Sequence, residues 1–160
     1  MLMPDVMTRL LANYEIRLNE RDHRMTPDEL RTFCTGATAI LPCPTERLDR
    51  PLMEALSPTL KLIACHSVGV DNVDLAAARD HNIVVTNTPD VLNDATVEIA
   101  MLLLLGAARR ASEGERMIRG EDWSNWGVDF MIGKQMTGAR LGIVGMGRIG
   151  RILAKRARAF

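Results

Sequence analysis

A glycine-rich run, GMGRIG at residues 145–150, constrains the fold of this chain more than any other feature. It follows an apolar β-like run and leads into a helical pattern. In a strand–turn–helix, Gly145 permits the tight turn, Gly147 lets the backbone approach a phosphate, and Gly150 lets the helix pack closely. Because a helix N-terminus attracts anions, the run predicts a dinucleotide pyrophosphate site. A purely structural glycine turn, or a turn for another nucleotide-like ligand, is the alternative.

Short β-like runs alternate with helical patterns along the rest of the chain. The predicted strands are 37–41, 60–64, 82–86 and 140–145. The predicted helices are the opening residues to about Tyr14, then 26–35 with Thr26 as N-cap, 46–56, 73–80, a long helix from about Asp94, and 149–159. This alternation is typical of α/β proteins, in which helices connect the strands of a parallel sheet.

The long helix that begins near Asp94 is the most apolar segment. Asn93 and Asp94 are suitable capping residues, and nearly every position from there to Ala108 is apolar. A helix that is apolar all round is expected to be buried, here between two domains. Gly120 is the predicted end of the polar stretch that follows, and residues 121–138 are predicted to form an excursion loop.

Two further motifs follow predicted strands. Residues 65–74, CHSVGVDNVD, follow the strand 60–64, and residues 86–92, TNTPDVL, follow the strand 82–86. Ligands of open α/β sheets bind at the carboxyl ends of strands, and a loop with a glycine can aim successive N–H groups at a carboxylate. The other reading of the first motif is an ordinary turn capped by Asp71 or Asn72. The residues alone favour neither.

Charge and cysteine usage exclude several classes of protein. Lys plus Arg and Asp plus Glu both number 20, so no net charge favours nucleic acid or an anionic membrane as partner. The five cations within 148–158 indicate a solvated helix face or a contribution to phosphate binding. Three cysteines without metal-ligand or redox spacing predict reduced thiols in the cytoplasm and no metal site. The most apolar run, 99–108, is about half as long as a membrane span, and the opening residues lack the apolar core of a signal peptide.

Taken in order, the motifs resemble those of the D-isomer-specific 2-hydroxyacid dehydrogenases, and within them the glyoxylate and hydroxypyruvate reductases. From about residue 14 onward the resemblance rests on SVGVDNVDLAAA, NIVVTNTPDVLNDATVEIAMLLLL, ARR and RLGIVGMGRIGRILAKRARAF. It implies a flavodoxin-like substrate (catalytic) domain over 1–92, incomplete, and an interdomain helix over 93–120. Over 121–160 it implies a dimer-type loop and the start of a Rossmann dinucleotide-binding domain, truncated after its first strand–turn–helix.

The resemblance also implies roles for individual residues. Val68 and Gly69 would donate backbone N–H groups to the substrate carboxylate, and Thr96 would lie near the nicotinamide. The pyrophosphate turn would consist of Gly145, Gly147, Arg148, Ile149 and Gly150. The cofactor is expected to be NAD or NADP, and the residue that selects between them falls beyond Phe160.

The implied reaction reduces a small 2-oxo acid, such as glyoxylate or hydroxypyruvate, to the D-2-hydroxy acid. In the family an Arg and a His held by a Glu carry the acid–base chemistry, and all three come from a later part of the nucleotide domain. No catalytic residue is therefore assigned here, and His66, beside the carboxylate loop, is interpreted as a bystander.

A cytoplasmic homodimer is the expected state of the complete enzyme. Trp123 and Trp126 resemble a dimer-loop feature of the reductases, and a core anchor is the other reading. The alternatives to the enzyme are a nucleotide-sensing protein like the C-terminal-binding corepressors, and an inactive, truncated gene product. A chain of this length is expected to be inactive alone, because none of its histidines matches the family's proton donor. It is also expected to be poorly soluble, because a lone strand at 140–145 leaves unpaired edges.

Overall fold

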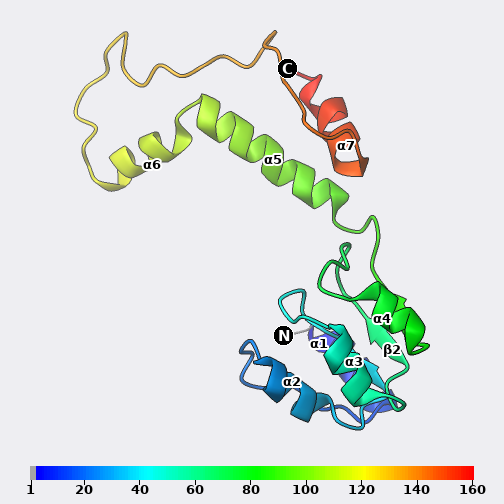
Figure 1. The fold of residues 1–160 in the computed structure, drawn as a ribbon. Coiled ribbons are helices and arrows are strands. Elements are labelled where there is room, and N and C mark those ends of the chain that lie inside the picture. Colours follow the sequence, from blue (N-terminus) through cyan, green and yellow to red (C-terminus); the bar gives the residue numbers. More distant parts are fainter. Residues whose placement is uncertain (1–2) are drawn as a thin grey trace. The chain divides into compact units, whose positions relative to one another are not determined.

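The computed structural model describes residues 3–160 (Figure 1). The chain divides into two compact units, Met1–Thr88 and Pro89–Phe160, called unit 1 and unit 2 below.

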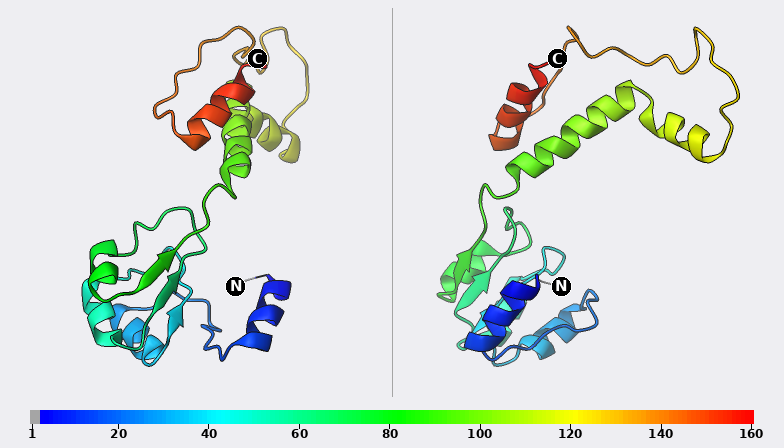
Figure 2. Two further views of the ribbon diagram at one scale, coloured as in Figure 1. Left: turned by 90° about the vertical axis from the view of Figure 1, so that its right-hand side faces the viewer. Right: turned by 180° about the vertical axis from the view of Figure 1, so that it is seen from behind.

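Unit 1 is built on a parallel sheet of three short strands in the order β1-β2-β3, which are β1 (Ala39–Ile40), β2 (Leu62–Ala64) and β3 (Val84–Thr86). The central strand β2 pairs in parallel with both neighbours. Helices α3 (Arg50–Leu56) and α4 (Leu75–Asp80) form the two crossovers (Figure 2). The parallel α/β arrangement predicted from the sequence is confirmed for this unit, with each strand shorter than predicted.

The helices of unit 1 begin where side chains supply caps. Helix α1 spans Pro4–Asn13 and α2 spans Pro27–Cys34. Thr26 caps α2 as predicted, because its hydroxyl accepts from the Glu29 N–H at 3.3 Å while the Glu29 carboxylate accepts from the Thr26 N–H at 2.8 Å. Helix α3 begins later than predicted, at Arg50, because Leu48 is held in an isolated parallel bridge to Val73 and Asp49 supplies the cap.

A single apolar core holds unit 1 together. Its largest fully buried side chains come from the sheet, from α3 and from the segments leading into them: Leu48, Met53, Leu56, Leu60 and Ile63. Ile63 lies at the middle of the central strand with none of its surface exposed. The core therefore fixes β2, and with it the start of the loop that follows at residue 65.

Unit 2 contains three helices, α5 (Asn93–Ala108), α6 (Ala111–Arg119) and α7 (Arg148–Ala157), and α7 lies alongside α5 (Figures 1 and 2). The strand predicted at 140–145 is wrong for the described chain. That segment is extended, but a β-strand requires a hydrogen-bonded neighbour, and every strand within residues 3–160 belongs to unit 1.

Helix α5 begins at the predicted place but differs from expectation in two ways. Neither Asn93 nor Asp94 caps it, because the Asn93 side chain donates to Asp90 and Asp94 pairs with Arg156. The helix is also not buried: in the described chain Val97 is its one buried residue, and the exposed positions include Ile99, Leu102 and Leu103. Helices α6 and α7 cover only part of its apolar surface. The predicted stop at Gly120 is confirmed as the C-cap of α6.

All three cysteines are free thiols, and two of them are buried in unit 1. Burial raises the pKa of both the Cys34 and the Cys65 thiol, which keeps them protonated at neutral pH. Within residues 3–160, no helix combines the length and the apolar character needed to cross a membrane.

The capping box of α2 predicts a specific pH dependence. The hydrogen bonds donated by the Thr26 N–H and hydroxyl hold the pKa of Glu29 below its ordinary value of 4.5. A depressed folded-state pKa contributes stability above the unfolded pKa and loses it as the pH falls through the folded value. Between about pH 5 and about pH 3, the urea midpoint of unit 1 should therefore fall less steeply in Glu29→Gln than in the wild type.

The measurement is urea unfolding followed by far-UV circular dichroism across that pH range. Glu20→Gln, which removes an exposed carboxylate outside the cap, serves as the control and should keep the wild-type slope. Equal slopes for the wild type and Glu29→Gln would contradict the role given to the cap.

Candidate functional site

The loop that follows β2 is held by hydrogen bonds that its carbonyl oxygens accept. The Ser67 hydroxyl donates to the Gly69 oxygen at 2.7 Å. The side-chain amide of Asn87, which follows β3, donates to the Val68 oxygen at 2.8 Å. The Thr88 N–H donates to the Ser67 oxygen at 2.9 Å. Three successive carbonyl groups of the loop are thus fixed from outside or across the loop.

The N–H groups of the same loop are available. Within residues 3–160, neither the Val68 nor the Gly69 N–H has an acceptor. The Gly69 backbone is exposed, and Val68 is half-buried. Two successive unpaired N–H groups at a strand end can donate to an anion such as a carboxylate. These are the two N–H groups to which the resemblance assigns the substrate carboxylate, and that role stays a prediction.

The alternative reading of this motif is wrong in its details. Neither Asp71 nor Asn72 caps the following helix, because the Asp74 carboxylate accepts from the Ala77 N–H at 2.8 Å. The Asn72 amide instead donates to the Glu46 carbonyl oxygen at 3.0 Å. Asn72 and Asp74 therefore bind backbone groups outside the segment 67–69.

His66 and Cys65, the two residues with reactive side chains before the loop, both have structural surroundings. His66 is exposed, and its Nδ1 lies 3.1 Å from the Pro42 carbonyl oxygen rather than against a carboxylate. Cys65 is buried, and its N–H donates to the Thr86 oxygen in the sheet. Neither residue has the partner that would activate it as a base or a nucleophile.

The glycine-rich turn of unit 2 has the shape predicted from its sequence. Gly145 has φ of +95°, in the left-handed region that favours glycine. A Cβ atom added to Gly150 would collide with the Gly145 carbonyl oxygen, so helix and turn approach each other as closely as a glycine allows. A Cβ atom added to Gly147 would meet nothing within 4 Å, which leaves open space at the start of α7.

That open space lies beside unpaired helix donors. Gly147 is the N-cap of α7 and has no side chain to satisfy them. The N–H groups of Arg148, Ile149 and Gly150 have no acceptor in the part of the chain that the structure describes. A ten-residue helix with a free N-terminus and a glycine at the cap fits a phosphate group by charge and by space.

Two further predicted cofactor residues are Arg148, the first residue of α7, and Thr96 on the neighbouring helix α5. Arg148 Nε lies 3.0 Å from the Asp90 carboxylate, and both side chains are mostly exposed. Thr96 lies on α5, the helix beside α7, and its hydroxyl donates to the Leu92 carbonyl oxygen at 2.9 Å. Val68 and Gly69 belong to unit 1, whereas Thr96 and the turn belong to unit 2.

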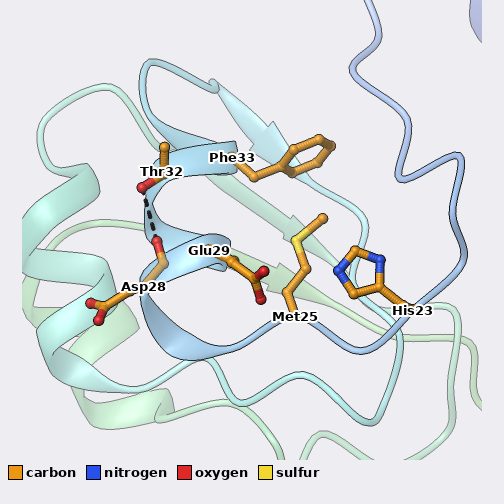
Figure 3. A pocket seen from close by; sticks show the side chains of 6 residues that line it. All are labelled: His23, Met25, Asp28, Glu29, Thr32 and Phe33. Atoms are coloured by element: carbon orange, nitrogen blue, oxygen red, sulfur yellow. Dashed lines mark hydrogen bonds between the residues drawn. The ribbon is translucent and has the colours of Figure 1, made fainter.

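Two hollows accompany these features. An open groove of about 460 Å³ runs between the extended segment before the turn and α7, lined by apolar side chains that include Leu141, Ile143 and Phe160. A second hollow lies beside α2 in unit 1 (Figure 3). It contains no predicted site residue, and Glu29 in its wall is already engaged by the capping box. No group of metal-ligating side chains comes together among residues 3–160.

Sequence reasoning assigned no role to three residues that shape these sites: Ser67, Asn87 and Asp90. The signal for Asn87 was available, because a residue that directly follows β3 must lie beside the residues that follow β2 when the two strands are parallel neighbours. Asp90 gave no such signal, since its partner Arg148 is distant in the sequence. The tryptophans of the excursion loop, Trp123 and Trp126, are both exposed in the described chain and are not core anchors there.

Comparison with known proteins gives a consistent result. Residues 2–156 match the family model described as the D-isomer specific 2-hydroxyacid dehydrogenase catalytic domain. A glycerate dehydrogenase of Hyphomicrobium methylovorum is 38% identical over 96% of this chain and 48% of its own length. A glyoxylate reductase of Thermococcus onnurineus is 36% identical over 94% of this chain and 46% of its own length. The chain thus spans about half the length of these relatives.

Solved structures show the same likeness. A Polaromonas crystal structure, assigned to the NAD-binding D-isomer specific 2-hydroxyacid dehydrogenases, superposes with a TM-score of 0.92 at 43% identity, over 99% of this chain and 50% of that one. The D-lactate dehydrogenase of Aquifex aeolicus, solved with NAD and lactic acid, superposes with a TM-score of 0.70 at 26% identity, over 81% of this chain and 38% of that one.

Removing the amide of Asn87 should loosen the loop locally. A side chain to backbone hydrogen bond contributes about 0.5–1.5 kcal/mol, so Asn87→Ala should lower the hydrogen-exchange protection factor of the Thr88 amide, which donates to the Ser67 oxygen, by about two- to tenfold. Exchange followed by NMR measures this directly. Asn19→Ala is the matched control, because that amide also donates to a backbone oxygen, that of His23, in a different loop. An unchanged protection factor at Thr88 in Asn87→Ala would show that the hydrogen bond from Asn87 to the Val68 oxygen does not order the loop.

Proposed function

The chain belongs to the D-isomer specific 2-hydroxyacid dehydrogenase family, and we propose that it contributes two binding sites to an NAD(H)-dependent oxidoreductase. Unit 1 binds the carboxylate of a small 2-oxo or 2-hydroxy acid, and unit 2 binds the pyrophosphate of the cofactor. The observation that carries the proposal is the loop 67–69, in which the carbonyl groups are engaged while the Val68 and Gly69 N–H groups are free.

The loop acts as a fixed carboxylate receptor. Because Asn87 and Ser67 occupy the carbonyl oxygens of Val68 and Gly69, these oxygens cannot turn toward an anion and repel it. The two N–H groups then hold the acid through its carboxylate and leave the adjacent C2 atom as the reacting centre. Preorganised donors of this kind lose little free energy to reorganisation on binding. Glyoxylate, hydroxypyruvate and similar acids are small enough to be held chiefly by this contact.

The turn of unit 2 fits the cofactor through its backbone. Gly147 leaves room for the pyrophosphate, and the N–H groups of Arg148, Ile149 and Gly150 supply donors with a favourable helix dipole. The Arg148 guanidinium adds a positive charge, and Thr96 is assigned to the nicotinamide end. Bound there, NAD(H) supplies the hydride acceptor or donor. Among the named relatives, the NAD-bound lactate dehydrogenase structure supports NAD(H) as the cofactor.

The proposal assigns binding and orientation to this chain, and no proton transfer. His66 lies against a carbonyl oxygen, so its ring lacks the carboxylate partner expected of the family's proton donor. The corepressor alternative is not favoured, because the relatives reported above carry the names of dehydrogenases and reductases. A homodimer in the cytoplasm stays part of the proposal, with the exposed Trp123 and Trp126 segment as the expected contact.

The carboxylate receptor can be tested with a pair of substitutions at one position. Gly69→Pro removes the N–H, whereas Gly69→Ala keeps it and brings a Cβ atom to 3.1 Å from the movable end of Asp71. Titration with oxalate, a non-reacting dicarboxylate, should shift the Val68 and Gly69 amide signals of the wild type in NMR spectra. Gly69→Ala should keep most of the oxalate affinity, and Gly69→Pro should lose it. Equal affinity in the two variants would refute the assignment.

The pyrophosphate turn can be tested in the same manner. Gly147→Val places a side chain in the open space at the start of α7, and it should lower NADH affinity more than about tenfold while the unfolding transition stays in place. Gly142→Val is the matched control, since a Cβ atom there also meets nothing within 4 Å but lies outside the turn. Calorimetry with NADH decides the matter: an unchanged affinity in Gly147→Val would remove the pyrophosphate from this site.

A further inference from the structure

We propose that Asp90 sets the cofactor affinity of the turn by occupying Arg148, and that a bound pyrophosphate must displace it. This inference rests on the proposed function, because it concerns the same turn. Asp90 Oδ1 lies 3.0 Å from Arg148 Nε, so the carboxylate and the cofactor phosphates compete for one guanidinium.

The carboxylate is held in place by more than the ion pair. The Asn93 side-chain amide donates to the same Oδ1 atom at 3.0 Å. Asp90 itself has φ of +68°, a left-handed conformation that Asp and Asn tolerate better than most residues. The side chain is therefore aimed at Arg148 by the local backbone and by Asn93.

Arg148 is the first residue of α7 and lies beside the turn, whereas Arg156, two helical turns further on, has other partners. Arg156 pairs with Asp94 at 2.7 Å and with Glu98 at 3.7 Å. Asp90, Asp94 and Glu98 thus recur every four residues and meet two arginines that are eight residues apart. Arg156, with Asp94 and Glu98, joins α5 to α7 away from the turn. Arg148, with Asp90, lies at the first residue of α7, beside the candidate anion site.

The Asp90 carboxylate and a phosphate would approach the Arg148 guanidinium from the same edge. An arginine grips a phosphate most strongly with two parallel N–H groups, and one such edge contains Nε. Asp90 Oδ1 lies 3.0 Å from Nε, so this carboxylate stands at an edge that a phosphate would use. The negative charge of Asp90 would also repel a phosphate bound beside Arg148. Because the Arg148 and Asp90 side chains are 66% and 59% exposed, water can solvate the released carboxylate and the exchange is inexpensive.

The test removes the charge of Asp90 and keeps its shape. Asp90→Asn retains a residue suited to positive φ and an oxygen for Asn93. Exposed ion pairs are worth about 0.2–1 kcal/mol, so NADH and inorganic pyrophosphate should bind Asp90→Asn about 1.4- to fivefold more tightly than the wild type. Titration calorimetry with each ligand gives the affinities.

Two controls separate the ion pair from general electrostatics. Asp94→Asn removes the same charge four residues along, where the partner is Arg156, and should change the affinity much less. In an Arg148→Gln background, Asp90→Asn should no longer tighten binding, because the guanidinium for which Asp90 and the phosphate compete is absent. Weaker binding by Asp90→Asn would mean that Asp90 positions Arg148 for the phosphate, and it would overturn the proposal. Equal gains from Asp90→Asn and Asp94→Asn would overturn it as well.

The same measurements distinguish this inference from the proposed function. If NADH binding is abolished by Gly147→Val yet equal in the wild type and Asp90→Asn, the turn binds the cofactor and only the role of Asp90 falls. If the wild type binds neither NADH nor pyrophosphate, both proposals fall together.

Discussion

The hydrogen-bonded pairing of β2 with both of its neighbours is the constraint on which the candidate acid site depends. Parallel pairing brings the carboxyl ends of β2 and β3 to one edge of the sheet, where the Cys65 N–H donates to the Thr86 oxygen. Ser67, three residues after β2, and Asn87, directly after β3, are thereby placed within reach of the same short loop. The core around Ile63 holds β2 in this register, because a slip by one residue would turn its buried side chains outward.

The sequence indicated the elements of unit 1 well because each has a local cause. The capping box at Thr26 and the apolar runs of the strands are readable from neighbouring residues. Unit 2 was less predictable, since its expected strand and its expected buried helix both depend on distant partners. Residues 140–145 have the composition of a strand, but composition supplies no hydrogen-bonded neighbour. Helix α5 has the composition of a buried helix, yet burial is a property of what packs against it.

The candidate sites show the same division. Glycines whose role is conformational could be identified in advance, since φ at Gly145 and the close approach at Gly150 follow from the motif. The partners that tune those sites could not be identified, because Asp90 and Arg148 meet only after the chain has folded. Resemblance to a family transferred the roles of Val68 and Gly69, but the clamp on their carbonyl groups is a property of three-dimensional structure alone.

Any side chain at Gly150 would collide with the Gly145 carbonyl oxygen, so the positions of the turn differ in what they can tolerate. The backbone at Gly150 allows no side chain without moving the helix. Met146, Arg148 and Ile149 are exposed and can change without disturbing the path of the chain. The turn is thus fixed at Gly150 and adjustable at three neighbouring positions, so its surface chemistry can be altered there while the path of the backbone is kept.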